Sequence, residues 1–360
     1  MFNTIHRVSR ASLIAVGALI SLSFTAKAEI TFPSSTFENL DYGLYWFDYT
    51  KAEKAIPGQA NPYYDPNKNT VLYIHGWQNG SVDANRRETL DRRNSGGPAM
   101  DLSQFWLDRG YNVGILYWNQ FADESEVKDA ESKIYSATAR QGMRWKSSVS
   151  GYQAGPNQSV TQLLTQSVLD NMQGYNGSEL RIAGHSLGNQ LALNIAYELR
   201  FNANANLRAD RVVLLDPFSS NWGKDYLGGK WTGEVSREYA FELKALGVAI
   251  ESYRSSPTSG TPFVGDANMA MMNELAFSEL KPWNFDFWQL AEKHGAAVTW
   301  YFWSKNFSTL DIANEALDAP SAASSTSQIR VLMDKNWSSN QDLGAYTESP
   351  ADDTFTKKSR

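Results

Sequence analysis

Short apolar segments alternate along the chain with longer amphipathic ones. Five apolar runs, several rich in valine, isoleucine or tyrosine, have the length and composition of buried β-strands. They cover residues 70–75, 112–118, 179–183, 211–215 and 247–253. Helical segments are expected around them, at residues 101–108, 130–145, 160–172, 190–200 and 236–246. This alternation predicts a mostly parallel β-sheet with helices on both faces.

The first 28 residues have the pattern of an exported protein. Basic residues stand near the start, an apolar run covers residues 11–25, and Ala26-Lys27-Ala28 places small residues where a signal peptidase cleaves. The run is short for a transmembrane span, although an N-terminal anchor is the alternative. Cleavage after Ala28 removes three cations and no acid, which takes the formal charge from −6 to −9. We therefore expect a secreted or periplasmic protein of bacterial style.

The composition narrows the possible chemistry. The chain has no cysteine, which excludes disulfides, thiol nucleophiles and cysteine-bound metals. A net charge of −6 leaves no basic excess, so duplex nucleic acid is not an expected partner. Acids are too sparse in residues 216–225 for a calcium loop, and we expect no metal or other cofactor. A mean hydropathy of −0.45 argues against an integral membrane protein.

One pentapeptide has the pattern of a nucleophile. Gly184-His185-Ser186-Leu187-Gly188 has the form G-x-S-x-G, with an expected strand directly before it and an expected helix directly after it. A sharp strand-to-helix turn needs small residues on either side, and it lifts the serine hydroxyl clear of the sheet. The helix N-terminus then points at the serine. A plain glycine-rich turn is the alternative, but this context favours Ser186 as a nucleophile.

A serine nucleophile needs a base, and histidine is the usual one. Beyond the expected signal peptide the sequence contains His75, His185 and His294. His75 ends an expected strand, and His185 lies inside the turn, with its side chain expected to point away from the pocket. His294 precedes a helical stretch expected from residue 296, and by elimination it is the base. His75 and His185 are expected to shape loops near the pocket.

The base in turn needs a carboxylate to hold its tautomer. Asp216 stands at the tip of the strand at 211–215, where ligand chemistry gathers in open α/β sheets. Asp266 is the alternative, because many hydrolases carry the acid after the next strand. The chain order Ser186, Asp216, His294 is that of the hydrolase fold.

Backbone N–H groups must stabilise the oxyanion of the tetrahedral intermediate. Leu187, the residue after the nucleophile, supplies one of them. The other is expected from the loop after an early strand. In His75-Gly76-Trp77 this assigns the second N–H to Trp77 and the turn itself to Gly76.

Four segments together resemble α/β-hydrolases of the pancreatic-lipase type. They are Ile74-His75-Gly76-Trp77, residues 184–188, residues 214–217, and His294 with the aromatic stretch after it. The resemblance covers roughly residues 69–306. It implies the α/β-hydrolase fold and an acid on the strand next after the nucleophile, which supports Asp216.

The sequence also departs from that family. Its animal members pin a lid with a disulfide and carry a C-terminal β-sandwich that binds lipid and colipase. This chain has no cysteine, and only 66 residues follow His294. Colipase dependence is therefore not implied.

In that family a lid precedes the catalytic histidine, and residues 255–292 occupy that place. The segment is rich in methionine and aromatic residues, so we expect a flexible acyl-binding cover, with a pair of core-packed helices as the alternative. The expected substrate contacts are Met271, Trp283, Phe285 and Trp288.

The expected organisation has three parts. A signal peptide at 1–28 is followed by an α/β-hydrolase domain at 29–318, which has the lid-like insertion before the catalytic histidine. Residues 319–360 form a small-residue linker and a C-terminal tail, with a single strand expected at 328–333.

These observations predict a secreted serine carboxylic-ester hydrolase that acts on lipid esters, with transient contact to a lipid surface. A phospholipase A1 or a lipid acyltransferase would use the same triad. A catalytically silent hydrolase fold used as a binding module is less favoured, because all three triad members are present. Carbohydrate binding through exposed tryptophans has no supporting motif. Arg86, Arg87, Arg92 and Arg93 could contact phospholipid head groups, but a solvated face is expected.

Overall fold

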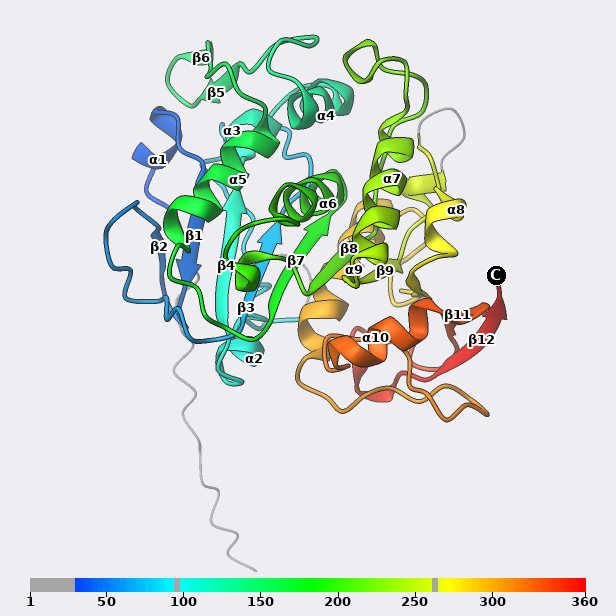
Figure 1. Cartoon of the computed structure of the whole chain (residues 1–360). Helices are drawn as coiled ribbons and strands as arrows, with labels where there is room; N and C mark the ends of the chain where they lie inside the picture. The colour runs from blue at the N-terminus through cyan, green and yellow to red at the C-terminus, as the bar shows by residue number, and fades with distance from the viewer. Residues whose placement is uncertain (1–29, 94–97, 261–264) are drawn as a thin grey trace, which may run out of the picture.

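A large β-sheet runs through the molecule (Figure 1). The computed structural model describes residues 30–93, 98–260 and 265–360, so the expected signal peptide lies outside the described residues. The five predicted strands are present and pair in parallel in the order β9-β8-β7-β3-β4. They are β3 (Thr70–Ile74), β4 (Asn112–Tyr117), β7 (Leu180–His185), β8 (Arg211–Leu215) and β9 (Ala249–Arg254). The predicted parallel α/β sheet is confirmed.

Strands that the sequence did not reveal extend both edges. Beside β4 lie the antiparallel β1 (Gly43–Phe47) and β2 (Ala52–Lys54). Beside β9 lie the parallel β10 (Ala276–Glu279) and β11 (Trp337–Gln341), followed by the antiparallel β12 (Phe355–Ser359). The complete ten-stranded order is β12-β11-β10-β9-β8-β7-β3-β4-β1-β2.

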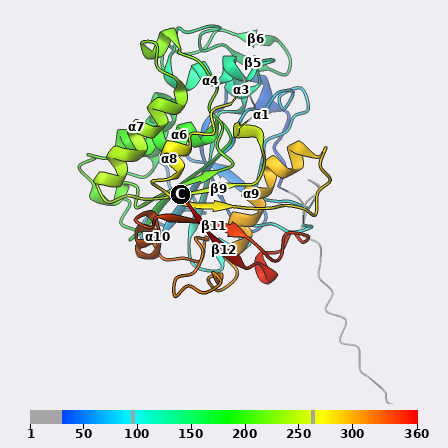
Figure 2. The same cartoon turned by 90° about the vertical axis from the view of Figure 1, so that its right-hand side faces the viewer.

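Helices cover both faces of the sheet, as Figures 1 and 2 show. Side chains alternate along each strand, so Leu72 and Ile74 pack into one apolar core while Val71 and Tyr73 pack into a second. The second core is closed by α2 (Gln104–Leu107) and α9 (Leu290–Ser304). The first is closed by α5 (Val160–Asn171), α6 (Gly188–Leu199), α7 (Thr232–Ala245) and α10 (Thr326–Met333). The two cores hold the strand ends in fixed positions.

The remaining elements are short. The helix expected at 130–145 is α4 (Val127–Tyr135), and the chain then forms a separate hairpin. That hairpin consists of β5 (Trp145–Ser147) and β6 (Gly151–Gln153). Single helical turns occur at α1 (Ser35–Glu38), α3 (Asn119–Ala122) and α8 (Met269–Met272). Within the described ranges, no helix is both long and apolar enough to cross a bilayer.

The C-terminal segment joins the main sheet. The strand expected at 328–333 is wrong: these residues lie in α10, whose start is fixed by a capping box between Ser325 and Gln328. β11 then pairs with β10, and β12 pairs with β11. Residues 319–322, expected in a linker, are buried. The C-terminal segment therefore contributes two strands and one helix to the fold.

The segment expected to be a lid is divided among several structures. Its central part forms α8 and β10, and β10 is hydrogen-bonded between β9 and β11. Met272, Leu275 and Phe277 are buried in the first core. Residues 255–292 therefore cannot move as one lid without opening the sheet, and they are not a pair of helices. Among the described residues of this segment, the loop between β10 and α9 exposes Trp283, Phe287 and Trp288.

Candidate active site

Ser186 occupies a sharp turn between β7 and α6. Its backbone has φ of 55°, in the left-handed region that non-glycine residues rarely adopt. Two flanking glycines make the turn possible. A Cβ on Gly184 would lie 2.1 Å from the carbonyl oxygen of Gly188, and a Cβ on Gly188 would lie 2.2 Å from that of Ile74. Strain of this kind persists where the surrounding structure fixes the residue, and it is common at functional sites.

The loop after β3 lies directly against Ser186. A Cβ on Gly76 would be 2.6 Å from the Cβ and 3.2 Å from the Oγ of Ser186. Any side chain at position 76 would therefore displace the serine. The backbone of the His75-Gly76-Trp77 turn approaches the hydroxyl closely, as oxyanion donors must.

Asp216 follows β8, the strand next to β7, and also has a left-handed backbone, with φ of 41°. Its N–H donates to the carbonyl of Tyr253 at 2.7 Å. Its side chain is fully buried. Oδ1 accepts the N–H groups of Ser255, at 2.7 Å, and Ser256, at 3.0 Å. These donors compensate the buried carboxylate for its lost hydration.

His294 reaches Asp216 from α9. Its Nδ1 lies 2.5 Å from Oδ2 of Asp216, so Nδ1 carries the proton and Nε2 is left as the basic nitrogen. The side chain is 19% exposed. His294 is inside the helix, which begins at Leu290 and not near residue 296 as expected.

The structure brings the three predicted triad residues to one edge of the sheet. Ser186 follows β7, Asp216 follows β8, and His294 follows β10 after a loop. The parallel strands β7, β8 and β10 all end at this edge. The hydroxyl of Ser186 makes no hydrogen bond to any described residue and stays available. This arrangement is that of the α/β-hydrolase fold.

The two amides predicted for the oxyanion hole belong to Leu187 and Trp77. The backbone N–H groups of Leu187 and Trp77 donate to no acceptor in the described part of the chain. Leu187 directly precedes α6, so its N–H points out of the helix N-terminus, where the partial positive charge favours an anion. The indole of Trp77 donates to the carbonyl of Glu124 at 2.7 Å, which fixes this loop.

His75 has the structural role predicted for it. Nε2 accepts the N–H of Trp118 at 3.3 Å, so Nδ1 donates to the carbonyl of Gly76 at 2.9 Å. The ring is fully buried and stacks on the indole of Trp118, with 5.7 Å between centroids. Burial lowers the pKa of His75 to about 4. A neutral imidazole therefore supports the turn beside Ser186.

His185 makes a hydrogen bond to the backbone of His294. Its Nε2 lies 3.0 Å from the carbonyl of His294, and a carbonyl can only accept, so Nε2 is the donor. Burial, and then the neighbouring His294, lower the pKa of His185 to about 4. The side chain also lines a cavity, to which neither Ser186 nor His294 contributes. His185 is the last residue of β7, and its side chain faces α9, the helix that contains His294.

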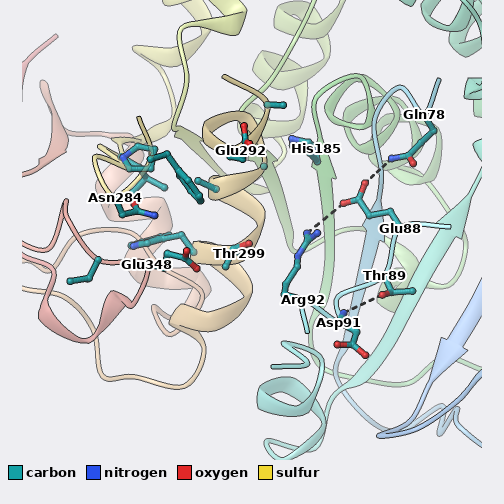
Figure 3. Close-up of a pocket in the computed structure, with 18 of the residues that line it drawn as sticks. Gln78, Glu88, Thr89, Asp91, Arg92, His185, Asn284, Glu292, Thr299 and Glu348 are labelled. Atoms are coloured by element: carbon teal, nitrogen blue, oxygen red, sulfur yellow. Dashed lines mark hydrogen bonds and ion pairs between the residues drawn. The ribbon is translucent and has the colours of Figure 1, made fainter. Parts of the chain in front are cut away.

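That cavity lies between α9 and the loop after β3 and has a volume of about 540 Å³ (Figure 3). Neither Ser186 nor His294 lines it. Glu88 extends into it and accepts from Gln78 at 2.8 Å and from Tyr73 at 2.6 Å. Burial is the largest single effect on Glu88 and opposes its charged form, but Arg92, His185, His75 and the hydrogen bond from Tyr73 together outweigh it, and the pKa of Glu88 falls to about 2. The cavity is therefore polar and charged on the side of this loop.

The arginine cluster is mostly paired within the protein. Arg87 is buried and donates to Asp41 and Asn119, Arg93 pairs with Asp91, and Arg92 pairs with Glu88 at 3.5 Å. Arg86 alone is exposed at the rim of the cavity. The expected solvated face is wrong for Arg87, because a guanidinium that is buried among aromatic rings needs these partners.

The predicted substrate contacts separate in space. Met271 is buried in the first core, so its assignment to substrate binding is wrong. Phe285 lines the cavity described above. Trp283 and Trp288 are 49% and 63% exposed on the surface loop between β10 and α9. Phe287 and Leu290 are exposed nearby, and so is Tyr346, which comes from the segment between β11 and β12 and contacts Trp283. This group of exposed apolar side chains is called the aromatic loop below.

The alternative acid lies elsewhere. Asp266 accepts the backbone N–H of Asn268 at 2.8 Å, and its own N–H donates to the carbonyl of Ser219. It makes no bond to His294. In the described parts of the chain no group of acids and histidines has the arrangement of a metal site.

Sequence reasoning missed Ser255, Ser256 and Glu88. Ser255 and Ser256 contact Asp216 only because β9 lies beside β8. A Ser-Ser pair after a strand carries no signal of its own. Glu88 lies in a polar loop, where an acid is expected to be exposed.

No model of a known protein family matches the chain, and no curated protein matches it in sequence. Solved structures match in part. An α/β hydrolase superfamily protein from Enterococcus faecalis is 16% identical, with a TM-score of 0.23, and the match covers 46% of this chain and 43% of that one. A probable hydrolytic enzyme from Pseudomonas aeruginosa is 16% identical, with a TM-score of 0.22, over 50% of this chain and 43% of that one.

A third match is a poly(3-hydroxybutyrate) depolymerase from Bordetella parapertussis, 13% identical, with a TM-score of 0.30, over 57% of this chain and 63% of that one. The chain thus spans less than half the length of the first two proteins. TM-scores this low carry no argument about activity. Any argument about activity must therefore come from the residues of the site.

Proposed function

We propose that the protein is a serine hydrolase that cleaves carboxylic esters. The observation that carries the proposal is the 2.5 Å contact between His294 Nδ1 and Asp216 Oδ2, at the edge of the sheet where the strained Ser186 turn ends. Such a contact orients an imidazole as a base. A strained serine with a free hydroxyl supplies the nucleophile.

Each residue then has one role. Nε2 of His294 takes the proton of Ser186 as its Oγ attacks the ester carbonyl, and returns it to the leaving alcohol. Asp216 holds the tautomer and stabilises the imidazolium. The N–H groups of Leu187 and Trp77 receive the negative charge on the carbonyl oxygen. Water resolves the acyl-enzyme by the same steps in reverse.

We further propose that the substrates are lipid esters presented at a surface. The aromatic loop supports this, because Trp283, Phe287 and Trp288 are exposed immediately before the helix that carries His294. Lys281 lies 5.3 Å from the ring of Trp283 and adds a cation beside it. Tryptophan and a basic residue together suit the boundary between lipid and water. The resemblance to pancreatic-type lipases points to the same class of substrate.

Phospholipids remain one possible class of lipid ester, with phospholipase A1 as the corresponding activity. The internal pairing of Arg87, Arg92 and Arg93 disfavours them as head-group ligands. Acyl transfer to a second alcohol would use the same acyl-enzyme. Export is part of the proposal, because the N-terminal segment has a basic start, a short apolar run and Ala26-Lys27-Ala28.

The test is covalent labelling followed by turnover. A fluorophosphonate probe should modify wild-type protein at Ser186, located by peptide mass spectrometry, and should leave Ser186→Ala unlabelled. A panel of 4-nitrophenyl esters, triacylglycerols and diacylphospholipids then ranks the substrates. A wild-type protein that is folded by circular dichroism, takes no label and cleaves no ester would refute the proposal and favour a binding module.

A further inference from the structure

Two serines that directly follow β9 contact Asp216 and the helical turn that contains His294. β9 and β8 are parallel, with Tyr253 opposite Leu215. The residues just beyond the two strands therefore meet at the same edge. Ser255 and Ser256 are 5% and 6% exposed.

Ser256 contacts the acid. Its Oγ donates to Oδ2 of Asp216, the same oxygen that accepts from His294. The hydroxyl oxygens of Ser256 and Thr258 lie 2.7 Å apart. Ser256 has a single proton and a carboxylate can only accept, so the Thr258 hydroxyl is the donor of this second bond. A short chain of hydroxyl groups therefore ends on the carboxylate that orients the base.

Ser255 contacts the helix of the base. Its Oγ donates to the carbonyl of Lys293 at 2.7 Å and accepts the N–H of Ala297 at 3.2 Å. In a regular helix this carbonyl and this N–H are each other's partners. The serine thus joins the turn that contains His294, while its own backbone N–H donates to Asp216.

We propose that Ser255 and Ser256 are positioning residues that fix His294 relative to Asp216, an inference that rests on the proposed function. Ser256 sets the orientation of the carboxylate, and Ser255 sets the helical turn of the imidazole. Asp216 and the helical turn of His294 are thus both hydrogen-bonded to the same two residues, which directly follow β9. Small errors in such placement reduce rates by one to two orders of magnitude.

The experiment compares Ser256→Ala with Ser256→Thr, which keeps the hydroxyl. Ser252→Ala is the matched control, because Ser252 is a buried serine of β9 whose hydroxyl has no partner among the described residues. Two measurements are made: steady-state kinetics on 4-nitrophenyl butyrate, which give kcat and KM, and the far-downfield proton NMR resonance of His294 Nδ1–H. A short charge-assisted bond gives rise to that resonance, and it reports the geometry whether or not an ester is cleaved.

Ser256→Ala should lower kcat by about tenfold to a hundredfold with KM within a factor of two, and should shift or broaden the resonance. Ser256→Thr should restore both, and Ser252→Ala should change neither. Ser255→Ala serves as a second variant and should broaden the resonance, because it loosens the helix.

A normal resonance together with a wild-type kcat in Ser256→Ala overturns the inference. Equal losses in Ser256→Ala and Ser252→Ala overturn it too, because they would reflect packing alone. A wild-type protein without esterase activity refutes the proposed function, whereas the resonance of the variants still decides the positioning role.

Discussion

His185 and His294 lie with their rings 4.6 Å apart, and the Nε2–H of His185 donates to the backbone carbonyl of His294. The residue before the proposed nucleophile, Ser186, therefore contacts the backbone of the proposed base. Because burial and the neighbouring imidazole keep the pKa of His185 near 4, it does this as a neutral donor and adds no positive charge beside the base.

Replacing His185 should affect the rate more than binding. His185→Ala leaves the carbonyl of His294 without this donor, and we expect kcat to fall roughly tenfold with KM nearly unchanged. The measurement is steady-state kinetics on a soluble short-chain ester. A tenfold rise in KM at constant kcat would instead place His185 in substrate binding through the cavity it lines.

The two candidate acids should separate clearly. Asp216→Asn should reduce kcat by roughly 10⁴-fold, because the amide favours the wrong imidazole tautomer. Asp266→Asn should reduce it by less than about threefold, because Asp266 only caps a backbone turn. Kinetics of the two purified variants decide this, and the reverse ranking would reassign the acid.

The strain at Ser186 should be measurable as stability. Ser186→Ala keeps a Cβ at φ of 55°, whereas Ser186→Gly removes it. We expect the glycine variant to be more stable than the alanine variant by about 1 kcal/mol, the left-handed penalty less the extra backbone entropy of glycine. Urea unfolding of both inactive variants tests this. If alanine is the more stable of the two, the turn is not strained in solution.

The aromatic loop should determine binding to lipid surfaces. At about 25 cal/mol per Å², a ring that buries about 100 Å² contributes about 2.5 kcal/mol. Phe287→Ala and Trp288→Ala should therefore each weaken binding to phosphatidylcholine vesicles by more than about tenfold, while kcat on a soluble ester stays unchanged.

Phe201→Ala is the control for that experiment. Phe201 is 66% exposed but follows the C-terminal end of α6, at the opposite edge of the sheet. Its replacement should leave vesicle binding as in the wild type. Equal vesicle binding by all three variants and the wild type would refute the surface proposal and favour a simple esterase.

Acid should destabilise the protein through its buried histidines. His75 titrates near 4 in the folded state and near 6.5 when unfolded. The unfolded chain therefore binds more protons between these values, and stability falls as the pH drops from about 6.5 toward 4. For one such group the loss between pH 7.5 and pH 5 is about 2 kcal/mol.

Urea unfolding at these two pH values, in wild type and in His75→Gln, measures the contribution. The variant is less stable at neutral pH because it loses the stack on Trp118, but its stability should fall by about 2 kcal/mol less on acidification. Parallel pH dependences in the two proteins would show that His75 is not buried in its neutral form.

Local sequence determined the centre of the sheet and the sharp turn at Ser186. The strands β3, β4 and β8 are short, largely apolar runs that are buried on both faces, so their composition alone marks them. The Ser186 turn depends on Gly184 and Gly188, because a side chain at either position would clash with the backbone. Both glycines lie within one stretch of five residues. The strands and the turn are properties of contiguous segments, and for that reason the sequence shows them.

Tertiary structure alone decided the edges of the sheet and the surroundings of the triad. β11 reads Trp-Ser-Ser-Asn-Gln and is a strand only because β10 offers it unpaired hydrogen-bonding groups. Met271 and Trp288 look alike in a hydrophobic pattern, yet one is in the core and the other at the surface. The contacts of Ser255 with Lys293 and of His185 with His294 span 38 and 109 residues of the chain. Such contacts depend on which strands lie side by side, and no local pattern encodes that.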